Sequence, residues 1–284
     1  MVNLTRSSLA VLLIAAMAAA ALAADPSPEE KAWNILEAAV REKSIPRRHD
    51  SILALGLLAG NSRAVGLAET GLDDHAPEVR AASATTLGEL HSIASIPKLQ
   101  LALKDKDISV VLAAAHSLWA LRDKQGYEIY YEILVGERKG GPGLIAGQEE
   151  RFKDPKKLAE FGFEQGIGFS IFTSIGWQVF KVIHTNDLAP VRAAAAKVLA
   201  DDPDPRSAEA LVKSCSDKSW IVRVAALDAL ARRGDPAYLD EIDSHTSDEK
   251  DLVRYTAAAG VIRLSGIPVP ERSKGDRASL PSRE

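Results

Sequence analysis

The side chains best suited to acid–base or metal chemistry are scattered along this sequence. None of the spacings that assemble ligands or nucleophiles is present: there is no HExxH, no CxxC, no Gly-x-Ser-x-Gly and no GxGxxG after a strand. A lone histidine is usually an ordinary surface or core residue, and the single cysteine, Cys215, is typical of a small packed side chain. We therefore expect no catalytic residue, no metal and no cofactor. The six histidines are His49, His75, His91, His116, His184 and His245.

The first residues have the pattern of a secretory signal. Arg6 precedes an apolar run from Leu9 to Ala21, and Ala21 and Ala23 are small residues of the kind that a signal peptidase requires. We expect residues 1–23 to be a signal peptide cleaved near Ala23, so that the protein is periplasmic or extracellular. A retained anchor is the alternative, although the run is short for a span of about 20 residues.

The net charge and the cysteine content restrict which partners and which stabilising bonds are expected. The net charge is −4 and no basic block occurs, so nucleic acid is not an expected partner, because such binding needs clustered Lys and Arg. One cysteine cannot form an intramolecular disulfide. Packing alone must stabilise the chain.

A unit of about 31 residues recurs along the chain. Aligned valines are followed by small residues at +3 and +4 and by Leu or Val at +8, positions that share one face of an α-helix. The intervening residues supply a second helix, with start signals at Ser27-Pro28, Asp204-Pro205 and Asp235-Pro236. The aligned residues are Val79, Val110, Val191, Val222 and Val253, and Arg48 stands 31 residues before the first of them.

Such units cannot bury both faces alone, so they stack. The fold class is therefore predicted to be all-α, a right-handed solenoid of helix-turn-helix repeats. Residues 24–135 hold the N-terminal repeats, with residues 27–40 as a capping helix, and residues 154–266 hold the remainder. Residues 267–284 are expected to be a disordered tail, and Trp33, Trp119 and Trp220 to pack on helices.

The Val-Arg-x-Ala-Ala core and the aspartate before it resemble HEAT repeats of the short bacterial form, also called phycobilisome-lyase HEAT-like repeats. The resemblance implies a structural ladder of aspartates and arginines that is broken at Val111, where an arginine is missing. Hydroxylases built on this repeat bind di-iron through His-Glu pairs; no histidine here is followed by Glu, which argues against that activity. A bilin lyase is opposed by the predicted export signal. The ladder residues would be Asp74, Asp105, Asp217 and Asp248 with Arg80, Arg192, Arg223 and Arg254.

One stretch departs from the repeat. The interval between Val110 and Val191 leaves room for one degenerate repeat and a Gly-rich insertion, residues 136–153. All six phenylalanines lie between Phe152 and Phe180. If they were exposed they would form a large apolar patch, which another surface would have to bury. Burial in the stack and contact with a partner both remain open. A membrane span is disfavoured because only 16 residues, Gln165 to Phe180, are free of charge.

The leading hypothesis is an exported scaffold or adaptor that binds a protein partner and has no catalytic chemistry. The first alternative is an exported enzyme, or an accessory subunit of one, with a site that combines His116, Glu149, Glu150, Arg151 and His184. The second is peripheral membrane association through the aromatic helix that contains Phe180. The oligomeric state is left open. Candidate partner-binding residues are Lys139, Leu144, Arg151, Phe152, Phe161, Phe163, Phe169, Phe172 and Trp177.

Overall fold

The computed structural model describes residues 25–135 and 189–267, and every regular element in these two ranges is a helix. The predicted all-α solenoid is confirmed. In chain order the elements are α2 (Pro28–Val40), α3 (Ile45–Leu55), α4 (Ser62–Gly71), α5 (Pro77–Glu89), η1 (Ile93–Ser95), α6 (Ile96–Ala102), α7 (Ile108–Ala120), α8 (Lys124–Val135), α12 (Ala189–Leu199), α13 (Pro205–Cys215), α14 (Trp220–Arg233), η2 (Pro236–Tyr238), α15 (Leu239–Ser244), η3 (His245–Ser247) and α16 (Asp251–Ser265).

The predicted helix starts are confirmed at their caps. Ser27 and Glu30 form a reciprocal capping box at α2, in which each side chain accepts a hydrogen bond from the other residue's backbone N–H. Asp204 caps α13 and Asp235 caps η2, each followed by proline at the first helical position. Short polar signals therefore set where these helices begin.

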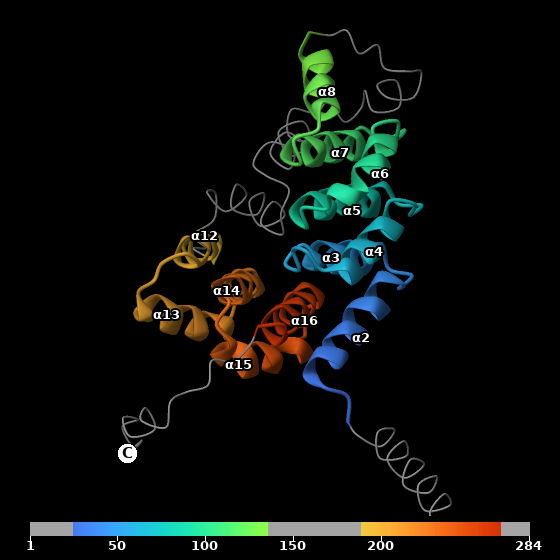
Figure 1. The fold of residues 1–284 in the computed structure, drawn as a ribbon. Coiled ribbons are helices and arrows are strands. Elements are labelled where there is room, and N and C mark those ends of the chain that lie inside the picture. The colour runs from blue at the N-terminus through green and yellow to red at the C-terminus, as the bar shows by residue number, and fades with distance from the viewer. Residues whose placement is uncertain (1–24, 136–188, 268–284) are drawn as a thin grey trace, which may run out of the picture.

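The helices form two layers. The inner layer contains α3, α5, α7, α12, α14 and α16, and each of these except α3 carries a repeat valine. The outer layer contains α2, α4, α6, α13 and α15. In the inner layer α7 packs on α5, α5 on α3, α16 on α14 and α14 on α12. In addition α16 packs on both α2 and α3, so the last repeat lies against the first (Figure 1). The spatial order is thus α7, α5, α3, α16, α14, α12, an arc whose centre is the junction of the two sequence ends.

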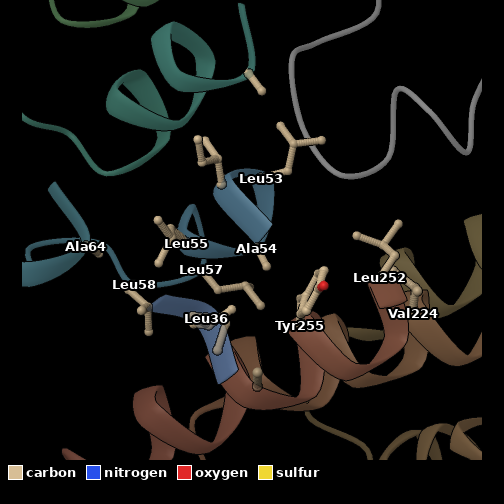
Figure 2. Packing of buried hydrophobic residues seen from close by; sticks show 14 of the residues in the cluster. Leu36, Leu53, Ala54, Leu55, Leu57, Leu58, Ala64, Val224, Leu252 and Tyr255 are labelled. Carbon is tan, nitrogen blue, oxygen red and sulfur yellow. The ribbon is translucent and has the colours of Figure 1, made fainter. Parts of the chain in front are cut away.

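This junction, which we call the seam, is part of the continuous core. Tyr255 of α16 is 4% exposed and lies toward Ala54 and Leu57 of the α3 segment, with Leu36 of α2 beside them (Figure 2). Leu36, Ala54 and Leu57 are almost completely buried. Because α16 packs on α2, the helix expected to cap the first repeat is itself covered by the last repeat.

Polar bonds cross the seam as well. Arg263 of α16 donates from Nη1 to the carbonyl oxygen of Leu57 at 2.7 Å and from Nε to that of Ala231 at 3.0 Å. Arg47 of α3 pairs with Asp251 of α16 at 3.1 Å. The Arg263–Leu57 and Arg47–Asp251 bonds join residues that are more than 200 positions apart in the sequence, whereas the Arg263–Ala231 bond links neighbouring repeats 32 positions apart.

Replacing Arg263 with alanine should destabilise the protein by roughly 1 to 3 kcal/mol, because two carbonyl oxygens lose a charged donor. Hydrogen exchange should show that amides of α2, α3 and α16 lose protection together. Arg41→Ala, which removes an exposed arginine from α2, is the control and should leave the exchange of α16 unchanged. Loss of protection confined to α16 would contradict a cooperative seam.

An ion-pair ladder runs along the loops of the stack. In each rung an arginine of one repeat donates to the aspartate in the loop of the next, and in the Arg80 rung both side chains are nearly buried. Burial alone would raise the pKa of the Asp105 carboxyl, but hydrogen bonds from Arg80 and from the backbone N–H of Asp107 outweigh it and hold the pKa below its ordinary value. The rungs are Arg48–Asp74 (2.7 Å), Arg80–Asp105 (2.7 Å), Arg192–Asp217 (3.0 Å) and Arg223–Asp248 (2.9 Å).

The ladder corrects the alignment of the first copy. Arg48 bonds to Asp74 as the other rung arginines bond to their aspartates, so it occupies the arginine position of the repeat and not the valine position. Val111 is fully buried and, in the part of the chain that the structure describes, no rung leaves α7. Arg254 does not form a rung to a following repeat; it bonds to Asp251 and to the carbonyl oxygen of Asp248.

Two predicted packing positions are exposed. Val191 of α12 is 57% exposed, whereas the equivalent Val79, Val110, Val222 and Val253 are buried. The buried residues of α12 include Ala193 and Ala196, so this face packs on α14 and the face with Val191 is turned away from it. Trp119, at the end of α7, is 55% exposed and is not packed as expected, while Trp33 is buried. Both exposed residues stand at the ends of the described arc.

The described helices include none that combines the length and the apolar character needed to cross a membrane. The predicted signal peptide (1–23), insertion (136–153) and aromatic helix lie outside the described residues. So does the predicted tail (267–284), apart from Ile267, which is partly buried and packs against the core.

Candidate functional site

All nine candidate partner-binding residues, from Lys139 to Trp177, lie outside the described residues. The same holds for four members of the alternative catalytic set, Glu149, Glu150, Arg151 and His184. The fifth, His116, lies on α7, half-buried, with its ring 6.0 Å from that of Trp119. Burial lowers the pKa of His116. The structure therefore does not test whether either set comes together.

A different group of charged side chains is brought together by the repeat register. They stand six and ten residues after the repeat valine, one helical turn apart on one side of the inner-layer helices. Position +6 holds Thr85, His116, Lys197, Asp228 and Ala259, and position +10 holds Glu89, Ala120, Asp201, Arg232 and Arg263. We call Glu89, Lys197, Asp228, Arg232 and Arg263 the charge cluster.

Members of the charge cluster interact across the arc. Glu89 lies at the end of α5, and its carboxyl group interacts electrostatically with Arg232 of α14 and Lys197 of α12. Since α3 and α16 separate α5 from α14 in the stack, these side chains can approach only on the concave side. A Cβ on Gly56, just after α3, would stand 2.1 Å from Glu89 Oε2. The absence of a side chain at this glycine therefore leaves room for the Glu89 carboxyl group.

Asp228 is the most buried charged group of the cluster. The residue is 1% exposed, and its Oδ2 accepts a hydrogen bond from Arg232 Nε at 2.9 Å. Its Oδ1 is also buried and has no hydrogen-bond partner among the described residues. An unsatisfied buried oxygen is costly, typically by about 1 to 3 kcal/mol, and a bound donor would remove that cost.

The cations of this region stand at the carboxyl ends of the inner helices. Arg263 donates to carbonyls after α3 and within α14, as described above. Arg233 donates from Nη1 to the carbonyl oxygen of Leu199, at the end of α12, at 2.9 Å. Helix carboxyl ends carry unsatisfied carbonyls and partial negative charge, which arginine side chains complement.

Burial changes the protonation of both acids in the cluster. Desolvation, reinforced by the negative charge of Asp228, raises the pKa of Glu89 to about 8, although Arg232 and Lys197 act in the opposite direction. Desolvation also raises the pKa of Asp228, against the opposing effect of Arg232. Near neutral pH the cluster therefore has three cations and, with Glu89 protonated, fewer anions.

The charge cluster is better suited to binding a ligand than to catalysing a reaction. A protonated carboxyl group, a buried acceptor and three cations offer hydrogen bonds and positive charge, and perturbed acids of this kind concentrate at functional sites. The sequence contained a signal for them that was missed: position +6 is charged or polar in every aligned repeat helix except the one with Ala259, and position +10 in every one except that with Ala120, whereas the other positions repeat Ala, Leu and Val. Their convergence depends on the seam, which the repeat pattern does not show.

The family can now be stated. The sequence matches the family described as HEAT repeats over residues 34–119 and 178–262, more than half of the chain. The chain belongs to the HEAT-repeat family. This HEAT-repeat protein has the repeated helical pairs and the loop ladder that the resemblance implied.

Two solved structures are similar to the HEAT-repeat protein. One is the complex of CpcE and CpcF of phycocyanin lyase from Nostoc sp. PCC7120, with 21% identity, a TM-score of 0.33, and coverage of 84% of this chain and 96% of that chain. The other is human deoxyhypusine hydroxylase in complex with glycerol, with 18% identity, a TM-score of 0.31, and coverage of 85% and 86%. No curated protein matches the sequence. Likenesses of this size carry no conclusion about activity.

Proposed function

We propose that this protein is an exported, non-catalytic HEAT-repeat scaffold that binds an acidic segment of a protein partner on its concave side. The observation that supports this most strongly is the charge cluster, in which Lys197, Arg232 and Arg263 gather around Asp228 and a Glu89 that is protonated near neutral pH, with Asp201 also facing Arg232. Export rests on the signal-like residues 1–23.

The charge cluster has the geometry of a recognition surface. It lies where charges from helices that are not neighbours in the stack approach one another, so an extended partner segment could contact several repeats at once. Asp228 Oδ1 offers a buried acceptor for a donor of the partner. The ladder arginines, by contrast, are each paired with an aspartate of the next repeat, although Nε of Arg192 is also buried and has no hydrogen-bond partner among the described residues.

The test compares two lysines on different layers. Lys197→Glu reverses an exposed charge on α12 within the cluster, and Lys213→Glu makes the same change on exposed α13 of the other layer. A partner is first identified by affinity capture from the extracytoplasmic fraction, and its binding is then measured with purified proteins. We expect Lys197→Glu to weaken binding at least about tenfold, Lys213→Glu to leave it unchanged, and added salt to weaken it.

Equal binding by wild type and Lys197→Glu would contradict recognition at the cluster. Deletion of residues 140–147 then tests the predicted Gly-rich insertion as the alternative binding surface. If this deletion abolishes capture of the partner while Lys197→Glu does not, recognition lies on the insertion. Binding of the purified protein to liposomes without any protein partner would favour the membrane alternative. Turnover of a substrate by the purified protein would favour the enzyme alternative.

A further inference from the structure

Three metal-ligating side chains meet on the outer layer, away from the charge cluster. Cys215 is the last residue of α13, Glu241 lies on α15, and His245 begins η3. The Cys215 Sγ, one oxygen of Glu241 and one ring nitrogen of His245 all lie within 4.8 Å of one another. Within this group His245 Nε2 is 3.4 Å from Glu241 Oε1.

The local folding explains the convergence. Glu241 and His245 are four residues apart across one helical turn, which places both side chains on the same side. Cys215 reaches them because α13 and α15 belong to successive repeats and end on the same side of the stack as the ladder aspartates Asp217 and Asp248. Two repeats therefore each contribute to one site.

The donor set suits Zn²⁺. Thiolate, imidazole and carboxylate are its three usual ligand types, and tetrahedral zinc bonds place ligand atoms about 3.3 to 3.6 Å apart. The distance between His245 and Glu241 already falls in that range, and the thiol needs a displacement of little more than about 1 Å. The geometry is thus close to a site before any ion enters.

One side of this three-residue site is buried in the core, and the other side faces solvent. Cys215 is fully buried in the core, whereas the side chains of His245 and Glu241 are 13% and 33% exposed. An ion could enter past Glu241 and keep a water molecule on the solvent side as its fourth ligand. Burial and the negative charge of Glu241 raise the pKa of the Cys215 thiol to about 12, so binding of the ion must release the thiol proton to solvent.

We propose that Cys215, Glu241 and His245 bind one Zn²⁺ ion, which links α13 to α15. The ion would join two helices of the outer layer, apart from the concave charges, and its three protein ligands leave the fourth position to water. It is independent of the proposed partner binding.

Cobalt provides the decisive test. The full chain, purified without an oligohistidine tag and stripped with chelator, is titrated with Co²⁺ under reducing conditions. Because Cys215 is the only cysteine, a thiolate-to-cobalt charge-transfer band can arise only at this site. We expect the band to saturate at one Co²⁺ per chain and to disappear when Zn²⁺, the stronger binder, is added.

Variants separate the site from general binding. Cys215→Ala should abolish the band, and His245→Ala, which changes a side chain near the surface, should weaken Co²⁺ binding at least about tenfold while the far-ultraviolet circular dichroism stays unchanged. His49→Ala, on α3, is the matched control and should bind as wild type does. Zn²⁺ should raise the Tm of wild type and His49→Ala but not that of His245→Ala.

Three results would overturn the proposal. They are the absence of the charge-transfer band, binding that needs millimolar Co²⁺, and an equal band in wild type and His245→Ala. If Cys215→Ala fails to fold, the comparison of His245→Ala with His49→Ala still decides the matter.

Discussion

Replacing Arg80 with alanine is expected to lower the free energy of unfolding by roughly 3 to 5 kcal/mol. The side chains of Arg80 and Asp105 are 8% and 14% exposed, so the change leaves a nearly buried carboxylate without its cation. Arg80 Nη1 also donates to the carbonyl oxygens of Asp74 and His75, and both would lose that donor. Urea unfolding followed by circular dichroism measures the difference.

The control for this prediction is a pair of the same chemistry in solvent. Arg206 binds Asp204 at 2.6 Å, but the arginine side chain is 85% exposed, so Arg206→Ala should lower the stability far less than Arg80→Ala does. If both variants lose the same stability, the rung contributes no more than a surface ion pair. Replacing Arg80 and Asp105 together by Met and Leu should recover part of the loss, because no unpaired charge remains.

Glu89→Gln is expected to stabilise the protein above neutral pH and to remove most of a pH dependence. The folded protein holds a proton at Glu89 up to about pH 8, whereas an ordinary glutamate has a pKa of 4.5. Unfolding therefore releases a proton between these values, and wild-type stability falls as the pH rises through this window. The expected loss is roughly 2 to 4 kcal/mol between pH 5 and pH 8, after allowance for solvent screening.

The measurement is the difference in unfolding free energy between wild type and Glu89→Gln at several pH values. Taking a difference cancels the contribution of His116, whose lowered pKa acts in the opposite direction. The raised pKa of Asp228 acts in the same direction as that of Glu89, and because the two carboxyl groups interact, the difference includes the change that the substitution causes at Asp228. Glu78→Gln, at the exposed start of α5, should keep the wild-type slope. A Glu89→Gln protein with the wild-type slope would show that Glu89 is ionised in the folded state at neutral pH.

Much of the local structure could be predicted because it is encoded in neighbouring residues. The pairing of Ser27 with Glu30 and the Asp-Pro pairs determine helix starts through backbone hydrogen bonds. The small residues after Val79 let neighbouring helices pack closely on α5, and those after Val222 do the same on α14. The ladder aspartates could be named because each stands a fixed distance before its repeat valine.

Contacts between distant repeats could not be predicted in the same way. Nothing near Tyr255 indicates that its ring packs against Ala54, since every repeat helix has a similar apolar face. The charge cluster and the group around Cys215 share this limit: each combines residues whose approach depends on superhelix curvature or on how successive repeats are offset. In the first copy, the spacing to the next repeat arginine differs by one residue from the repeat length of 31. An alignment by spacing alone therefore did not reveal the role of Arg48.

The seam has a consequence for how the chain reaches its native state. In an ordinary solenoid each repeat contacts the next in sequence, so folding can spread through short loops. Here α16 must find α2 and α3 across more than 200 residues of sequence. Native contacts of such long separation slow folding, because the loop must close before the contacts form. In a circular permutant that joins the two sequence ends, the contacts of α16 with α2 and α3 would become local in sequence, and we expect this permutant to fold faster.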